Sequence, residues 1–222
     1  MKKYLPLLVL SSTTLLAGSF ANASQPTDNL SELYSAAQQS GLPNQVLTDA
    51  LHSYDWAKTH GTVENPNVLT VVDYSMPSTA KRMWVLDLKT DTVLLNTLVA
   101  QGKNTGLNYA THFSNDPSSH ETSLGVYTTG MEPYFGKHGR SLKVFGLEKG
   151  INNNAYSRAI EIHGAAYVSP TIAEETGRIG RTFGCFGVSQ SVIDKVVNYT
   201  QGGSVLFAYA APENSDPVVA NG

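Results

Sequence analysis

Cysteine is almost missing from this chain: Cys185 is the only one in 222 residues. A single thiol cannot form an internal disulfide, so no disulfide framework holds the fold together. An isolated cysteine is most often a small buried apolar side chain. Here Gly184 precedes the thiol and Phe186-Gly187 follow it, so a substrate could approach the sulfur closely. We therefore treat Cys185 as a candidate nucleophile.

The chain also lacks an excess of positive charge. It has 15 Lys and Arg against 18 Asp and Glu, a formal net charge of -3. Without a basic field the chain has no electrostatic footprint for nucleic acid, and we expect no nucleic-acid partner.

A metal-binding pattern is missing as well. His120-Glu121 is not followed by the second histidine that a helical zinc motif needs, and His112 and His138 lie in predicted loops. We expect no metal and no cofactor.

Long apolar runs are missing except near the N-terminus. Lys2-Lys3 precedes an apolar stretch from Leu5 to Ala17, and Ala21-Asn22-Ala23 reads as a small-x-small cleavage signal before Ser24. Residues 1–23 are thus predicted to be a cleaved signal peptide. The alternative, an N-terminal membrane anchor, is disfavoured because the run is too short for the ~30 Å of hydrocarbon in a bilayer. Removal of two lysines would lower the net charge to -5, and we expect no membrane span in the mature protein.

Helical periodicity follows in residues 24–62, which we predict to be an N-terminal helical extension. The first helix carries Leu30, Leu33 and Ala37 on one face, with Asn29 or Ser31 as its cap, and ends near Gly41. The second runs from about Pro43 to His60. Both should pack on the main domain.

The pattern changes at Val68, where short β-branched runs begin. Residues 63–210 are predicted to be one mainly β (α+β) catalytic domain, a sandwich or barrel rich in antiparallel hairpins rather than alternating βαβ units. Short helices are expected to start at Ser169-Pro170 and at Ser191 with Asp194, and residues 211–222 should form a loose tail. The predicted strands are Val68–Tyr74, Met83–Leu88, Val93–Val99, Gly125–Thr128, Ser141–Phe145, Ile160–His163, Cys185–Val188 and Val205–Tyr209.

A histidine precedes the thiol by 22 residues, at His163. If the strands that hold His163 and Cys185 are neighbours, the imidazole can act as a base for the thiol. Backbone amides of Gly184 and Cys185 could then form an oxyanion hole. A base, a nucleophile and a hole are the parts that acyl transfer needs.

The chain resembles the catalytic domain of the murein L,D-transpeptidases, in the exported proteobacterial branch of the YkuD-like superfamily. The resemblance covers most of the mature chain. It is carried by Trp84–Leu88, Phe113–Asn115, Ser123–Tyr127, Tyr134–Gly139 with Ser141-Leu142, Ser157–Ile160, His163–Ala165, and Gly177-Arg178 through Gly184-Cys185.

The resemblance implies a periplasmic enzyme, a monomer, whose partners are peptidoglycan stem peptides. Cys185 would attack the diaminopimelate carbonyl of a tetrapeptide stem and expel D-alanine, and the amine of a second stem would resolve the thioester. His163 would be the base, with Gly164 holding its other nitrogen. The thiol would also resemble those that carbapenems attack.

The sequence departs from the family pattern after the thiol. The usual Ser-His-Gly-Cys with an arginine within two residues is replaced by Thr182-Phe183-Gly184-Cys185 and Phe186-Gly187, so the usual carboxylate-binding arginine is absent. Candidates for substrate binding are Arg181, Arg178, Arg158, His138 and Tyr134.

Three alternatives remain open. Water in place of the amine would make the protein an L,D-carboxypeptidase or endopeptidase. A different thiol enzyme fits poorly, because a papain-like peptidase places its cysteine before its histidine. A catalytically silent wall-binding module would leave Cys185 structural.

Overall fold

The computed structural model describes residues 1, 30–61, 63–210 and 218. The predicted signal peptide after Met1, the proposed cap Asn29 and most of the predicted tail lie outside them. The helices are α1 (Ser31–Gln39), α2 (Asn44–His60), α3 (Pro170–Thr176) and α4 (Ile193–Thr200). The strands are β1 (Val68–Asp73), β2 (Met83–Asp87), β3 (Thr92–Thr97), β4 (Val99–Ala100), β5 (Gly125–Thr129), β6 (Tyr134–Gly136), β7 (Gly139–Gly146), β8 (Glu161–Ala165), β9 (Phe186–Ser189) and β10 (Val205–Tyr209).

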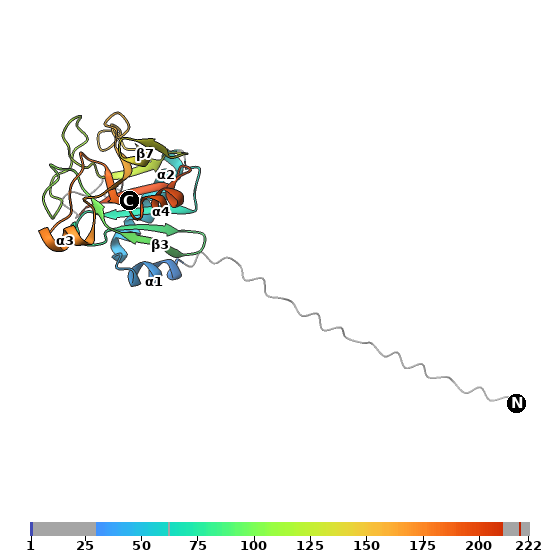
Figure 1. The fold of residues 1–222 in the computed structure, drawn as a ribbon. Coiled ribbons are helices and arrows are strands. Elements are labelled where there is room, and N and C mark those ends of the chain that lie inside the picture. The colour runs from blue at the N-terminus through green and yellow to red at the C-terminus, as the bar shows by residue number, and fades with distance from the viewer. Residues whose placement is uncertain (2–29, 62, 211–217, 219–222) are drawn as a thin grey trace.

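One strongly curved mixed sheet forms the body of the protein (Figure 1). Its order is β3-β2-β1-β10-β5-β7-β8-β9-β4, with β6 paired to β7. The strands at the two ends of this order, β3 and β4, are separated in sequence only by Leu98. The sheet must therefore curl until its edges nearly meet, which gives an almost closed barrel. This confirms the predicted mainly β fold class.

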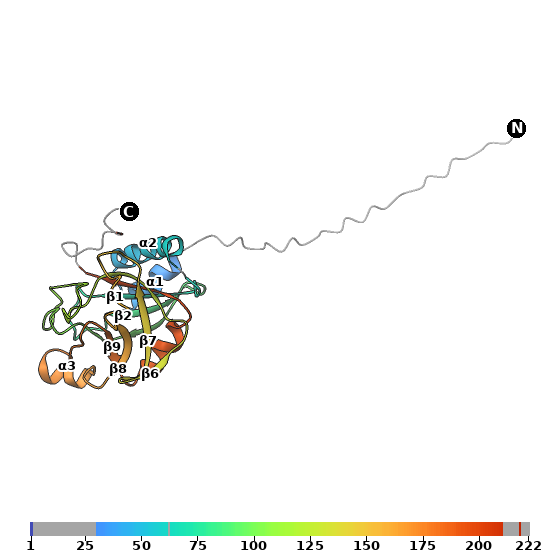
Figure 2. The same cartoon turned by 90° about the horizontal axis from the view of Figure 1, so that it is seen from above.

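The two N-terminal helices cover the outer face of the barrel. Alternate residues of β10 point to opposite sides: Val205 and Phe207 pack with α1 and α2, whereas Leu206 and Ala208 pack with the cluster that contains α4. Figure 2 shows α1 and α2 together along one side and α3 at the far end. The helices thus share a core with the sheet, as predicted.

Strand pairing departs from the prediction where the candidate site lies. The hairpin of β2 and β3 is antiparallel as expected, but β8 and β9 are parallel and α3 connects them. A parallel pair needs such a crossover, so the fold contains one βαβ unit that the spacing of the strands did not predict. The short strand β6 was missed, since three residues carry too little periodicity. The predicted strand Val93–Val99 is divided at Leu98 into β3 and β4.

A side-chain cap and a glycine set the two ends of α3, whereas the starts of α1, α2 and α4 have no side-chain cap. Ser169 Oγ accepts a hydrogen bond from Ile172 N at 3.2 Å, and Gly177 ends α3 at φ 72°, both as predicted. The predicted start of α4 at Ser191 is two residues early: the helix begins at Ile193 with Val192 as its N-cap, and the Ser191 hydroxyl lies 3.0 Å from Ser189 Oγ.

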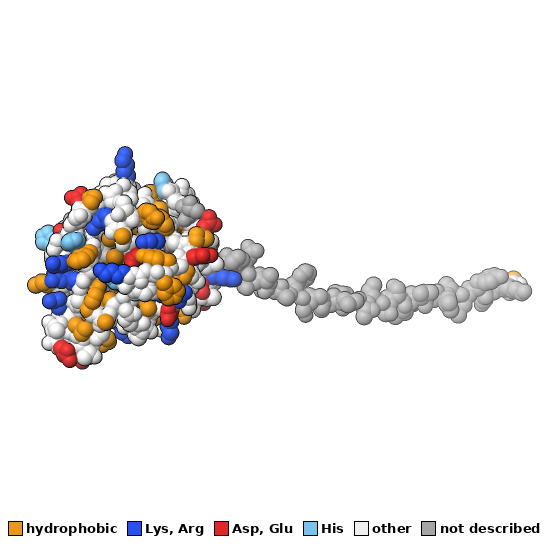
Figure 3. Space-filling view, turned by 45° about the horizontal axis from the view of Figure 1, so that its top comes forward, with side chains coloured by type: hydrophobic (Ala, Val, Ile, Leu, Met, Phe, Trp, Pro, Cys, Tyr) orange, Lys and Arg blue, Asp and Glu red, His pale blue; other side chains and the backbone are white. Residues whose placement is uncertain are grey.

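The surface mixes charges. Basic, acidic and apolar side chains are interspersed over the face in Figure 3. In the part of the chain that the structure describes, no helix is long and apolar enough to cross a bilayer.

Candidate active site

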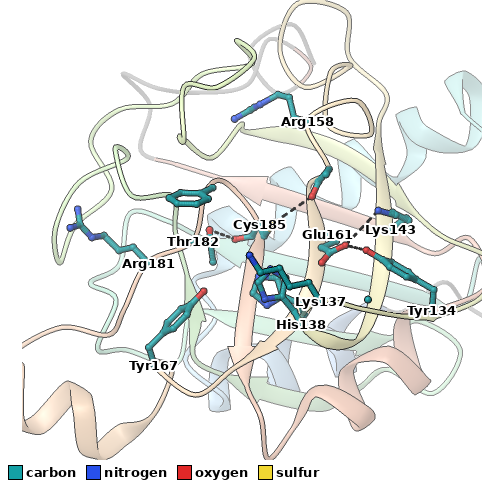
Figure 4. A pocket seen from close by; sticks show the side chains of 14 residues that line it. Tyr134, Lys137, His138, Lys143, Arg158, Glu161, Tyr167, Arg181, Thr182 and Cys185 are labelled. Atoms are coloured by element: carbon teal, nitrogen blue, oxygen red, sulfur yellow. Dashed lines mark hydrogen bonds and ion pairs between the residues drawn. The ribbon is translucent and has the colours of Figure 1, made fainter.

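A cavity of about 530 Å³ opens where the β6–β7 hairpin, β8 and the segment before β9 meet (Figure 4). Of the three residues proposed for catalysis, His163 and Cys185 line it, whereas Gly164 is not among its lining residues. The other lining residues are Tyr134, Gly136, Lys137, His138, Lys143, Arg158, Ala159, Glu161, Tyr167, Arg181, Thr182 and Phe183.

His163 lies in the middle of β8, and only 2% of its surface is exposed. Its Nδ1 lies 3.0 Å from the carbonyl oxygen of Gly164. A carbonyl can only accept a hydrogen bond, so Nδ1 carries the proton and Nε2 keeps its lone pair. Burial lowers the pKa of His163, and the His138 ring, stacked on it at 4.3 Å, acts in the same direction. The imidazole is therefore a neutral base with one fixed tautomer.

Cys185 directly precedes β9, two residues before Gly187, the residue that pairs with His163 across the parallel strands. The thiol is half-buried and donates to the Ala159 carbonyl, with Sγ and oxygen 3.6 Å apart. Ala159 has φ 54°, a strained conformation for a residue with a Cβ, and strain of this kind is concentrated at functional sites. Burial raises the pKa of the Cys185 thiol to about 11.

The thiol and the imidazole thus rest as a neutral pair rather than as thiolate and imidazolium. Because only the thiolate reacts, we expect alkylation of Cys185 by iodoacetamide to rise about tenfold per pH unit through pH 8 to 10. The measurement is the modification rate by intact mass, with Cys185→Ala as the unlabelled control. A rate that levels off below pH 8 would show a preformed ion pair and contradict this account.

The turn before the thiol requires glycine at position 184. Gly184 has φ +121°, and a Cβ there would lie 2.7 Å from both the Glu121 carbonyl oxygen and Ile160 Cδ1. Its N–H donates to Thr182 Oγ1 at 3.1 Å, and the same hydroxyl donates to the Cys185 carbonyl at 2.8 Å. Thr182 thus shapes the turn, and the oxyanion role of the Gly184 and Cys185 amides stays a prediction.

The three candidate arginines have different positions. Arg181 lines the cavity while donating to the carbonyls of Lys103 and Gly106. Arg178 is not among the lining residues, and its described contact is a 3.4 Å bond to the Ile179 carbonyl. Arg158 lines the cavity, but its guanidinium is bonded to Ser114, Ser119, Glu121 and Ser123. Arg181 is the best placed of the three for a substrate carboxylate.

Arg158 anchors the loop of residues 114–123 beside the site. We expect Arg158→Ala to lower the free energy of unfolding by about 2–4 kcal/mol, since four bonds from one guanidinium are lost and their acceptors are partly buried. Urea denaturation measures this change. Arg178→Ala is the matched control, with an expected change within about 0.5 kcal/mol. Equal stability of the two variants would remove the anchoring role.

Sequence reasoning missed Lys143 and Glu161. Glu161 lies two residues before His163 on β8 and so faces the same side of the strand. This parity could have indicated Glu161, whereas nothing in the sequence places Lys143 beside it. Tyr134 and His138, both predicted, do line the cavity. Among the described residues, no group of three His, Cys, Asp or Glu side chains is placed to hold a metal ion.

Comparison with known proteins gives a family and several similar folds. A family model described as "L,D-transpeptidase catalytic domain" matches residues 38–209, beginning inside the predicted helical extension. A search of curated proteins found no match.

Among solved structures, the L,D-transpeptidase from Mycobacterium smegmatis is 14% identical, with a TM-score of 0.38 over 64% of this chain and 58% of that one. The helical cell shape determining protein Pgp2 from Campylobacter jejuni is 12% identical, with a TM-score of 0.43 over 76% and 59%. The L,D-transpeptidase (Yku) from Stackebrandtia nassauensis is 10% identical, with a TM-score of 0.39 over 82% and 78%. The chain spans less than two thirds of the length of the first two.

Proposed function

Because this chain belongs to the L,D-transpeptidase catalytic domain family, we propose that it transfers peptidoglycan stem peptides through a thioester on Cys185. The donor is a tetrapeptide stem, cut at its diaminopimelate carbonyl with release of D-alanine. The acceptor is the amine of a second stem. The signal-like pattern of the N-terminal sequence supports a periplasmic location for this reaction.

The chemistry follows from the resting protonation states. As Sγ attacks the donor carbonyl, the thiol proton passes to Nε2 of His163, and the carbonyl oxygen becomes an oxyanion. Collapse breaks the bond to D-alanine, whose nitrogen takes the proton back from His163. The acceptor amine then attacks the thioester, loses a proton to His163, and the thiol leaves with that proton.

The observation that carries this proposal is the fixed tautomer of His163 in the cavity that the Cys185 thiol also lines. The Gly164 carbonyl orients the ring, so that Nε2 is the basic nitrogen in a cavity that Cys185 also lines. The thiol has a high pKa, so the neutral imidazole takes its proton only as the sulfur forms its bond to the donor carbon. Proton transfer is therefore coupled to nucleophilic attack.

Product analysis tests the proposal. Purified mature protein is incubated with disaccharide tetrapeptide, and the products are separated by mass. Crosslinked dimer with free D-alanine is the expected result. Tripeptide with D-alanine but no dimer would mean that water resolves the thioester, making the protein an L,D-carboxypeptidase. Unchanged substrate would contradict both and leave a binding module.

A further inference from the structure

Three side chains on neighbouring strands form a charged cluster on one wall of the catalytic cavity. They are Tyr134 on β6, Lys143 on β7 and Glu161 on β8, and Figure 4 shows them side by side. Lys143 and Glu161 are direct partners across the two strands, with Nζ 3.6 Å from Oε2. The Tyr134 hydroxyl donates to the same Oε2, and Lys143 Nζ lies 4.6 Å from the centre of the Tyr134 ring.

The Glu161 carboxylate is buried but still reaches the cavity. Only 6% of the residue is exposed, and both described contacts of its side chain are made by Oε2, which leaves Oε1 for a ligand. Lys143 keeps 31% of its side chain exposed and also lines the cavity. A buried ion pair is weak evidence for a stabilising role, because apolar residues of similar volume often stabilise the fold equally well. Because this pair faces the cavity that contains Cys185, ligand binding explains its position better than fold stability does.

The cluster lies on the strand that carries the proposed base. Glu161 and His163 are two residues apart on one strand, a separation of about 6.6 Å along β8, and their side chains share a face. The charges of Glu161 and Lys143 also act in opposite directions on the pKa of the Cys185 thiol, as charges close to the sulfur do.

We propose that Lys143 and Glu161 bind the zwitterionic amino-acid end of the donor's diaminopimelate side chain, an inference that rests on the proposed function. The ammonium of this end pairs with Glu161, and its carboxylate pairs with Lys143. A short methylene chain separates this end from the carbonyl that Cys185 attacks. Tyr134 holds Oε2 so that Oε1 faces the ligand.

The wild-type protein gives the first test. D-alanine release is followed with two tetrapeptide stems, one with diaminopimelate and one with lysine, which has the ammonium but no carboxylate. We expect kcat/KM to favour diaminopimelate by at least about tenfold, because a lysine stem leaves Lys143 without its partner. Equal rates with the two stems would overturn the inference while leaving the proposed function intact. No release from either stem would instead count against the proposed function.

Two variants assign the discrimination to the pair. Lys143→Met should bring the diaminopimelate-to-lysine ratio to within about threefold of one. Glu161→Gln keeps the shape and should remove the preference for a free side-chain amine over its N-acetylated form. Lys137→Met, a lysine of the same cavity outside the pair, is the matched control and should keep both preferences. If Lys137→Met lost these preferences, or if both Lys143→Met and Glu161→Gln kept them, the discrimination would belong to residues other than Lys143 and Glu161.

Discussion

Replacing Cys185 with alanine is expected to lower D-alanine release by at least about 10⁴-fold, the largest effect of any single change in this protein. The sulfur is the atom that becomes acylated, and no second thiol exists in the chain to replace it. Removing the nucleophile of a covalent mechanism leaves only positioning and charge stabilisation by the rest of the site. The measurement is a single-turnover assay with tetrapeptide stem.

The fold should survive this change, because Cys185 is only half-buried at the margin of the core and its hydrogen bond to the Ala159 carbonyl is weak, with Sγ and oxygen 3.6 Å apart. Thermal unfolding of Cys185→Ala should therefore stay within a few degrees of the wild type. Stable Cys185→Ala that still releases D-alanine at more than a hundredth of the normal rate would mean that the sulfur is structural.

The second large effect is expected at His163. Its imidazole takes the thiol proton, so His163→Ala should lower kcat/KM by about 10²–10⁴-fold near neutral pH. Raising the pH toward the thiol pKa of about 11 should restore part of the loss, because hydroxide then forms the thiolate without a base. In the wild type, activity should fall as the pH drops through the lowered pKa of His163, since the protonated ring cannot accept the proton.

His112→Ala provides the control for this experiment. His112 lies in the loop between β4 and β5, hydrogen-bonds Thr111 Oγ1 at 2.9 Å, and is not among the cavity-lining residues. Its loss should leave the rate within about twofold of normal. If His163→Ala lost activity equally at every pH, the imidazole would be positioning the substrate rather than moving a proton.

The sequence brings His163 and Cys185 together as candidates, and the structure places both on one cavity, whereas most of the cavity wall could not be predicted. His163 and Cys185 could be singled out because the residue type gives the chemistry and the surrounding apolar pattern predicts the strands. Both are local signals in the sequence. The parallel pairing of β8 and β9 was not predicted, since α3 between them is short and the register depends on the whole curled sheet.

The walls depend on contacts between distant parts of the chain. Arg158 was a candidate for substrate binding, yet its partners are carbonyls and hydroxyls of a loop that begins at Ser114, 44 residues earlier. Any residue can offer a carbonyl, so no sequence pattern marks such a contact. The contact between Lys143 and Glu161 also depends on the fold, because only the register of β7 and β8 makes the two residues neighbours.

The most direct test of the central claim is to isolate the acyl-enzyme. The protein is mixed with tetrapeptide stem, quenched in acid within seconds, and digested with trypsin, which releases Cys185 in the peptide Thr182–Lys195. We predict that this peptide gains the mass of the stem without its D-alanine, as a thioester that hydroxylamine removes and that is missing in Cys185→Ala. Product formation with the peptide unmodified at every quench time, or with the adduct on another peptide, would contradict the account.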